Sequence, residues 1–260
     1  MITSAHNARL QQVRRLTGRP RERRQENAFV VEGVRLVEEA LQADWSFHFC
    51  LYDQGLSDRG KTLVQNLLAK GISCEETTPG LLQKVSETEN TQGLLAVVEL
   101  ATLPVPADLT FALVFDSVRD PGNLGTLLRT AAATGAQAVF LPPETTDAFA
   151  PKVLRAGMGA HFHLPVLDLD WVEIQARLSG LNVFLADMAG SLTCWQADFR
   201  SPLALIIGGE AEGASEPARR LAQRLISIPM PGQAESLNAA MAGAVLMFEV
   251  VRQRQPQLIP

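Results

Sequence analysis

Residues 111–129 read FALVFDSVRDPGNLGTLLR and contain a complete transition from a strand through a loop to a helix. The uninterrupted apolar run Phe111–Phe115 is typical of a strand that is buried on both faces of a parallel sheet. The Asp-Pro-Gly sequence at Asp120 favours a tight turn, and Thr126–Ala133 has a helical composition. The stretch therefore predicts an α/β fold with polar residues at the carboxyl end of a strand, where such folds bind ligands.

The rest of the chain alternates strand-like and helix-like segments in two blocks. In the first block we expect strands at Phe29–Val31, Phe47–Tyr52 and Leu94–Leu100, and helices at Gly33–Ala43 and Gly60–Lys70. In the second block we expect strands at Phe111–Phe115, Ala138–Leu141, Leu181–Ala186, Leu203–Gly208 and Leu225–Ile228, and a last helix at Ser236–Arg252. Near-continuous apolar strands that alternate with helices predict a parallel sheet covered on both faces.

A proline-containing segment separates the two blocks. The sequence LPVPAD at 103–108 holds two prolines two residues apart, which disfavour both a helix and a strand ladder. We therefore expect an N-terminal α/β domain at 1–102, a linker at 103–109 and a C-terminal α/β domain at 110–260.

The composition indicates a globular protein, because 47% of the 260 residues are hydrophobic and 20% are charged. We expect no membrane span, since no apolar run approaches about 18 residues, and no signal peptide, since Met1–Gln12 is polar. The three cysteines are far apart and odd in number, which fits a reducing cytoplasm. Neither they nor the four histidines have metal-ligand spacing, so we expect no metal.

Positive charge is concentrated at the start of the chain although the formal net charge is −5. Residues 1–24 contain seven arginines against Glu22 alone, a local net charge of +6. Such a cluster can neutralise nucleic-acid phosphates, and the alternative is a solvated helix and loop. The candidate nucleic-acid-binding residues are Arg14, Arg15, Arg19, Arg21, Arg23 and Arg24.

Three loops at predicted strand ends carry the candidate chemistry. In the first loop, Arg129 could clamp a phosphate or an anionic transition state, or it could be a surface arginine of an amphipathic helix. The second loop, GGEAEG at 208–213, permits close backbone approach to a ligand or forms an ordinary turn. It lacks the Lys-Ser/Thr pair of a phosphate-binding loop and the glycine spacing of a dinucleotide fingerprint, which disfavours a nucleotide-binding oxidoreductase.

The third loop, IPMPGQAESLN at 228–238, leads into the last predicted helix. Ser236 is placed as the N-cap of this helix, a structural role that is compatible with a functional one. The small residues of Ala239–Ala244 let another backbone approach closely, which suits tight helix packing across a dimer.

In this order and spacing, the three loops resemble the signature motifs of the SpoU/TrmH family of RNA ribose 2′-O-methyltransferases, within the SPOUT superfamily. The matching residues are Asn123, Gly125 and Arg129 in the first motif, Gly208, Glu210 and Gly213 in the second, and Ile228–Met230 with Ser236–Asn238 in the third. The three motifs together span residues 123–238 and are highly specific, although each alone is weak.

The resemblance covers nearly the whole chain. Pro151–Ala160 is similar to an auxiliary segment of the family, with Gly157 where serine is common. Ile2–Asn7 and Phe29–Gly33 resemble the ribosomal-protein-like substrate-binding domain that many members carry. The resemblance thus implies a small N-terminal α/β domain of this type and a C-terminal parallel-sheet domain with a SPOUT-type trefoil knot, although chains in general avoid knots.

The resemblance also implies a homodimer that binds S-adenosylmethionine and methylates RNA. It places cofactor contacts on Gly208, Gly213, Ile228, Met230 and Leu237, and it places Asn123, Arg129, Glu210, Ser236 and Asn238 around the reacting ribose. Ribosomal RNA is the preferred substrate, and transfer RNA stays an alternative. An RNA-binding protein of the same fold without catalysis is the main rival from another class.

Overall fold

Internal contacts divide the chain into two compact units. One consists of Met1–Ala101 with Phe149–Phe162, and the other of Thr102–Ala148 with His163–Pro260. The predicted limits, 1–102 and 110–260, did not foresee that a segment from the middle of the chain groups with the first unit. The computed structural model describes residues 1–86, 91–209, 213–233 and 235–255.

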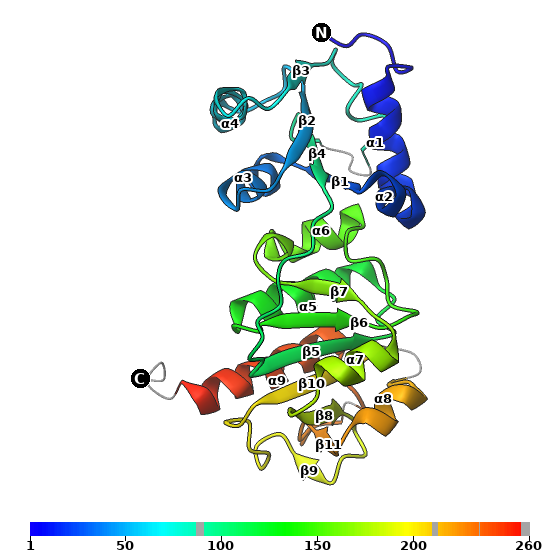
Figure 1. Cartoon of the computed structure of the whole chain (residues 1–260), viewed down its shortest axis with the longest axis vertical. Helices are drawn as coiled ribbons and strands as arrows, with labels where there is room; N and C mark the ends of the chain where they lie inside the picture. The colour runs from blue at the N-terminus through cyan, green and yellow to red at the C-terminus, as the bar shows by residue number, and fades with distance from the viewer. Residues whose placement is uncertain (87–90, 210–212, 234, 256–260) are drawn as a thin grey trace. The chain divides into compact units, whose positions relative to one another are not determined.

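The first unit is a four-stranded sheet with helices on both faces. Its strand order is β1-β4-β2-β3, antiparallel except for the parallel β2–β3 pair. Helices α1 and α2 lie on one face of the sheet, and α3 and α4 lie on the other (Figure 1). The elements are α1 (Ala8–Gly18), α2 (Pro20–Glu26), β1 (Ala28–Glu32), α3 (Val34–Gln42), β2 (Phe47–Tyr52), α4 (Asp58–Ala69), β3 (Cys74–Glu76), β4 (Leu94–Glu99), α6 (Pro151–Gly157) and η1 (Ala160–Phe162).

Aromatic packing explains why Phe149–Phe162 belongs to the first unit. The ring of Phe29 in β1 lies 4.9 Å from that of Phe149 and 5.7 Å from that of Trp45, measured between centroids. Trp45 also packs edge-on against Phe162, at 5.3 Å, and its indole N–H donates to the Phe162 carbonyl. Each aromatic pair in such geometry stabilises the fold by about 1 kcal/mol beyond the hydrophobic contribution of burying the two rings.

The second unit is a seven-stranded sheet in which every neighbouring pair is parallel, which confirms the predicted fold class. Its strand order is β7-β6-β5-β10-β8-β11-β9. The trefoil knot stays a prediction, because strand order alone does not define how the chain threads. The elements are β5 (Phe111–Asp116), α5 (Pro121–Ala133), β6 (Ala138–Leu141), β7 (Val166–Asp168), α7 (Trp171–Arg177), β8 (Asn182–Ala186), β9 (Leu192–Thr193), β10 (Leu203–Gly208), α8 (Glu216–Leu221), β11 (Arg224–Ser227) and α9 (Ala239–Arg254).

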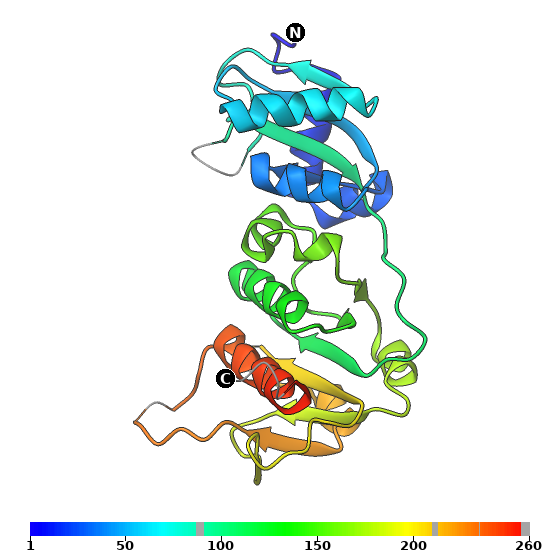
Figure 2. The ribbon, with the colours of Figure 1, turned by 90° about the vertical axis from the view of Figure 1, so that its left-hand side faces the viewer.

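Helices cover both faces of this second sheet. Figures 1 and 2 show α7 and α8 on one face and α5 and α9 on the other. On the first of these faces, Ile174 of α7 and Ala218 of α8 share a buried cluster with strand residues such as Val114 and Ile206. On the other face, α5 packs against α9, and α9 also contacts β10. Strands buried on both faces explain the continuous apolar runs in the sequence.

Two predicted helix starts were wrong by several residues. Helix α5 begins at Pro121 rather than Thr126, because the Asp120 carboxylate accepts from the Asn123 amide and Pro121 suits the first helical position. Helix α9 begins at Ala239, and Asn238 rather than Ser236 is its N-cap. Asparagine and serine are about equally good caps, so the local sequence does not distinguish these two starts.

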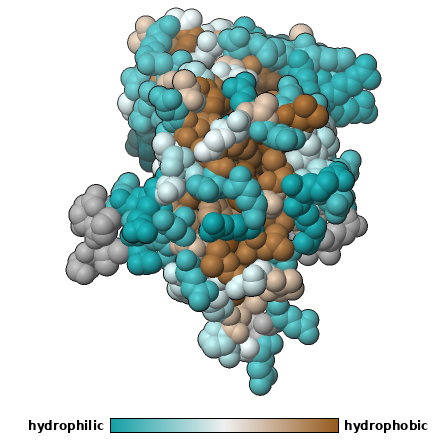
Figure 3. Space-filling view, turned by 60° about the horizontal axis from the view of Figure 1, so that its bottom comes forward, coloured by the Kyte–Doolittle hydropathy of each residue, from teal (hydrophilic) through white to brown (hydrophobic). Residues whose placement is uncertain are grey.

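Part of the surface is apolar. Figure 3 shows apolar residues in the middle of the face that it presents, with hydrophilic residues around them. No described helix combines the length and the apolar character that crossing a membrane requires. Within the second unit, the large apolar side chains that are exposed are Val172, Met188, Trp195, Leu237, Met241, Val245 and Phe248.

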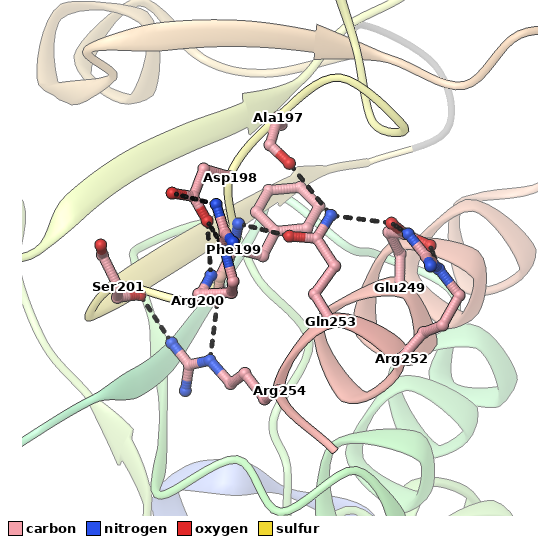
Figure 4. Close-up of polar contacts among 9 residues, drawn as sticks. All are labelled: Ala197, Asp198, Phe199, Arg200, Ser201, Glu249, Arg252, Gln253 and Arg254. Carbon is pink, nitrogen blue, oxygen red and sulfur yellow. Dashed lines mark hydrogen bonds and ion pairs between the residues drawn. The ribbon is translucent and has the colours of Figure 1, made fainter. Parts of the chain in front are cut away.

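The carboxyl end of α9 is tied to the loop after β9 by hydrogen bonds. The Gln253 amide accepts from the Phe199 N–H and donates to the Ala197 carbonyl, and Arg254 donates to the Phe199 and Ser201 carbonyls (Figure 4). Burial lowers the pKa of Arg254 from its usual value. These bonds fix one end of the helix whose other end forms the candidate site.

Candidate active site

The first motif lies at the amino end of α5. Asn123 occupies the first turn of the helix and Arg129 lies nearly two turns further along. Arg129 is exposed, whereas its neighbours Leu127 and Leu128 are buried. Arg129 therefore stands on the outer side of α5, where its guanidinium can meet a bound substrate.

The third motif meets the first through two asparagines. The Asn238 side-chain oxygen accepts from the Ala240 and Met241 amides and so caps α9. Its Nδ2 donates to the Oδ1 of Asn123, 3.1 Å away and 115 residues apart in the sequence. The amino ends of α5 and α9 thus lie side by side, and each presents backbone N–H groups that attract negative charge.

The second motif follows β10, where the backbone is too crowded for side chains. An ideal Cβ at Gly208 would lie 2.6 Å from the Ala214 nitrogen, and one at Gly209 would lie 2.1 Å from the Ser117 oxygen. The buried Asp116 carboxylate holds the far side of this loop by accepting from the Ser215 amide at 2.6 Å. The two glycines are therefore required by close backbone packing, and Glu210 lies outside the described residues.

A cavity of about 420 Å³ opens between the second and third motifs. All five residues predicted to bind the cofactor line it, and so does Ser236. Asn123, Arg129 and Asn238 are not among its lining residues, although the Asn123–Asn238 bond joins the first motif to the third. The lining residues are Ala186, Asp187, Met188, Ile207, Gly208, Gly209, Gly213, Arg219, Ile226, Ile228, Met230, Ser236, Leu237, Ala239 and Ala242.

Sequence reasoning missed an ion pair in the wall of this cavity. Asp187, directly after β8, pairs with Arg219 of α8 at 2.6 Å. The position of Asp187 at the carboxyl end of a parallel strand was the signal that could have identified it. Arg219 gave no such signal, because arginines are common on the outer faces of short helices.

The N-terminal arginines do not form one uniform surface. Arg23 is 3% exposed and donates to the Leu16 and Thr17 carbonyls at the end of α1, so its assignment to RNA was wrong. Arg15 is exposed and pairs with Glu26 at 2.9 Å, and Arg24 is exposed as well. Arg14, Arg19 and Arg21 are exposed, and none of them forms an ion pair with another described residue. These three are the arginines best placed to meet a phosphate backbone.

Within the described ranges, no group of three or more histidine, cysteine, aspartate or glutamate side chains has the geometry of a metal site. The cysteines are free thiols, and Cys50 faces Cys74 across the β2–β3 pair. The Cys50 side chain and the nearby Arg9 lower the pKa of the Cys74 thiol, whereas hydrogen bonding to Cys74 and burial raise that of Cys50.

A sequence profile of the SpoU rRNA Methylase family matches residues 110–248, and one of the MRM3-like substrate binding domain matches residues 7–96. The chain belongs to the SpoU rRNA methylase family. Among its relatives is the 23S rRNA (guanosine(2553)-2′-O)-methyltransferase RlmP of Bacillus subtilis, 33% identical over 96% of this chain and 98% of the other. The 23S rRNA (uridine(2479)-2′-O)-methyltransferase of Streptomyces viridochromogenes is 34% identical over 97% and 92%.

A solved structure of the family supplies a comparison of the fold. The AdoMet-bound rRNA methyltransferase from Sinorhizobium meliloti superposes with a TM-score of 0.86 at 30% identity, and covers 98% of this chain and 97% of its own. SpoU methylases use S-adenosylmethionine. The cavity of this SpoU methylase suits such a ligand in size, since small-molecule sites measure about 300–1,000 Å³. Its isoleucine walls suit a purine ring, and its glycines allow backbone groups to approach the ligand.

Gly209→Ala is expected to damage both stability and cofactor binding. Its Cβ would overlap the Ser117 carbonyl oxygen, so β5 and the loop after β10 must separate, at a cost of about 2–3 kcal/mol. Chemical denaturation and calorimetric titration with S-adenosylhomocysteine would measure both losses. Gly232→Ala is the matched control, because no atom of the described residues lies within 4 Å of its Cβ position. Equal stability and affinity in the two variants would contradict the crowding argument.

Proposed function

We propose that this SpoU methylase transfers a methyl group from S-adenosylmethionine to a ribose 2′-hydroxyl of ribosomal RNA. The observation that carries the proposal is that the second and third motifs line one cavity and that the first motif is hydrogen-bonded to the third, in a chain whose relatives are named as 23S rRNA 2′-O-methyltransferases. We assign residues 1–102 to RNA binding, 103–109 to a linker and 110–260 to methyl transfer. Three free thiols support a cytoplasmic location.

The cofactor site is proposed to be the cavity itself. Gly208 and Gly213 frame it from the loop after β10, and Ile228, Met230 and Leu237 close it from the loop before α9. When bound, S-adenosylmethionine supplies an electrophilic methyl group on a sulfonium sulfur. The task of the chain is to hold the acceptor oxygen in line behind that methyl group, because positioning alone can supply much of the acceleration.

The ribose site is proposed to lie beside the cavity, at the paired amino ends of α5 and α9. Asn123 and Asn238 hold one another, so their side-chain dipoles have a fixed direction toward the substrate. Ser236 lines the cavity two residues before Asn238 in the sequence, and its hydroxyl can hydrogen-bond the ribose. Glu210 keeps its proposed role as an acid/base group or as an orienter of Asn123.

Arg129 is proposed to grip the phosphate next to the target ribose and to stabilise negative charge that develops on the 2′-oxygen. Its exposed position on α5 leaves it accessible to RNA. A guanidinium keeps its proton in proteins, so Arg129 does not act as the base. It favours proton loss from the hydroxyl electrostatically, since a fixed positive charge stabilises the resulting alkoxide.

Arg129→Ala is expected to reduce methyl transfer by about 10²- to 10³-fold, because the charge on the oxygen and phosphate is then unbalanced. A tritiated-methyl assay on ribosomal RNA measures the loss. Affinity for S-adenosylmethionine should change by less than about threefold in calorimetry, since Arg129 does not line the cavity. Arg177→Ala on α7 serves as the control. Near-normal turnover of Arg129→Ala would end this assignment.

RNA binding by the first unit is proposed to use Arg14, Arg19 and Arg21. Replacing all three by glutamine should weaken RNA binding and make the plot of log K against log salt shallower by about 2, since each phosphate contact contributes about 0.7. Filter binding at several salt concentrations measures the slope. The control replaces three cations of the same unit that are already in ion pairs, namely Arg59, Lys61 and Lys70. Equal slopes in both triple variants would refute the proposed surface.

A homodimer is proposed to form through α9. Met241, Val245 and Phe248 recur every three or four residues along α9, so they share one side of the helix. Leu237 lies just before the helix, and each of the four side chains is at least 40% exposed. A continuous apolar stripe of this kind marks an interaction surface. Leu237 also lines the cavity, so a partner subunit on this stripe would adjoin the cofactor site.

Met241→Glu combined with Phe248→Glu is expected to convert the dimer to a monomer, because two carboxylates would be buried in an apolar contact. Light scattering coupled to gel filtration measures the mass. The control places glutamate at Leu68 and Val172, which are exposed apolar residues on α4 and α7. A variant that keeps the mass of a dimer would show that α9 is not the contact.

A further inference from the structure

The charged residues in the wall of the cofactor cavity form one isolated pair. Among the described residues that line the cavity, Asp187 and Arg219 are the charged ones, and the others are apolar, glycine or serine. They come from different elements, since Asp187 follows β8 and Arg219 belongs to α8. Their side chains meet at 2.6 Å.

Asp187 is held firmly in this arrangement. Its side chain is 13% exposed, and its second carboxylate oxygen accepts from the Ala189 amide at 2.8 Å. The Asp187 backbone N–H donates to the Ile226 carbonyl of β11. An anchored carboxylate of this kind fixes the partner guanidinium in one place.

Arg219 therefore lies close to two loops that contribute to the cavity wall. One of its nitrogens, Nη1, pairs with Asp187 after β8, and the other, Nη2, lies 3.9 Å from the Cβ position of Gly213 after β10. A guanidinium has five N–H donors, and the pair with Asp187 accounts for a minority of them. The Arg219 side chain is 42% exposed, so it is accessible to a ligand that enters the cavity.

We propose that Arg219 binds the carboxylate of the amino-acid group of S-adenosylmethionine, and that Asp187 is the positioning residue that holds the guanidinium for this contact. The inference rests on the cofactor site proposed above. The cofactor carries one anionic group, this carboxylate, and Arg219 is the cation in the described wall. Guanidinium and carboxylate form two parallel charge-assisted hydrogen bonds, which give orientation as well as affinity.

The test compares two ligands that differ only in the carboxylate. S-adenosylhomocysteine carries it, and decarboxylated S-adenosylhomocysteine keeps the adenosine, the thioether and the ammonium group. Both are titrated by calorimetry into the full-length wild-type chain and into R219Q, D187N, D187N/R219Q and the control R220Q. Arg220 lies next to Arg219 on α8, outside the cofactor cavity, and pairs with Glu216. Thermal denaturation verifies that each variant is folded.

We expect R219Q to bind S-adenosylhomocysteine about 10- to 100-fold more weakly, the value of a charged hydrogen bond, while its affinity for the decarboxylated ligand stays within about threefold. D187N should show a smaller loss with the same ligand dependence, and R220Q should match the wild type. Such a pattern supports the carboxylate contact because a change in cavity shape would affect both ligands.

Three results would overturn the assignment. Equal losses on both ligands in R219Q would indicate a role in cavity shape, and no loss on either would exclude contact. Recovery of S-adenosylhomocysteine affinity in D187N/R219Q would show that Arg219 only neutralises Asp187. A wild-type chain that binds neither ligand would instead refute the cofactor cavity itself, and the Arg219 assignment with it, so the two failures are distinguishable.

Discussion

The close packing of α5 on α9 is the constraint on which the candidate site depends. Gly243 makes it possible, since a Cβ at this position would lie 2.4 Å from Cδ2 of the buried Leu127. The amino ends of the two packed helices also lie close together, and there Nδ2 of Asn238 donates to Oδ1 of Asn123. The bonds at the other end of α9 prevent it from sliding along the sheet (Figure 4). The first and third motifs therefore lie together because α5 and α9 are packed tightly against one another.

Much of this arrangement could be predicted from the sequence because its signals are local. Continuous apolar runs predicted five of the seven parallel strands within one residue, whereas the short strands β7 and β9 were not predicted. Of the three predicted loops, the second and third line the cavity. Helix starts were harder, since Asp120-Pro121 reads as a turn but caps a helix. The burial of Arg23 could not be predicted, because the hydrogen bonds from its guanidinium to two carbonyls of α1 depend on how α2 packs against α1. Asp187 could have been identified from its position after a parallel strand, but its pairing with Arg219, 32 positions away, has no local signature.

The proposed division of labour follows from where charge lies in each unit. The first unit exposes arginines at the amino end of a chain that is acidic as a whole. The cavity of the second unit is walled by apolar and glycine residues, with one compensated ion pair. Non-specific attraction to RNA can therefore be strong in one unit without placing uncompensated charge beside the cofactor. In the proposed site, the described residues supply fixed dipoles and the exposed guanidinium of Arg129, and Glu210 is the candidate for a titrating group.

The return of Phe149–Phe162 to the first unit has a consequence for how this chain can be rearranged. The polypeptide passes between the two units three times, so cutting at the proline-containing linker does not separate them cleanly. A fragment that starts after residue 102 would carry Phe149 and Phe162 without the Phe29 and Trp45 rings that bury them. A chimaera in which the amino-terminal module is replaced must therefore have the internal segment Phe149–Phe162 replaced as well. The amino-terminal module and the internal segment therefore depend on one another for packing, although about fifty residues of the second unit separate them in the sequence.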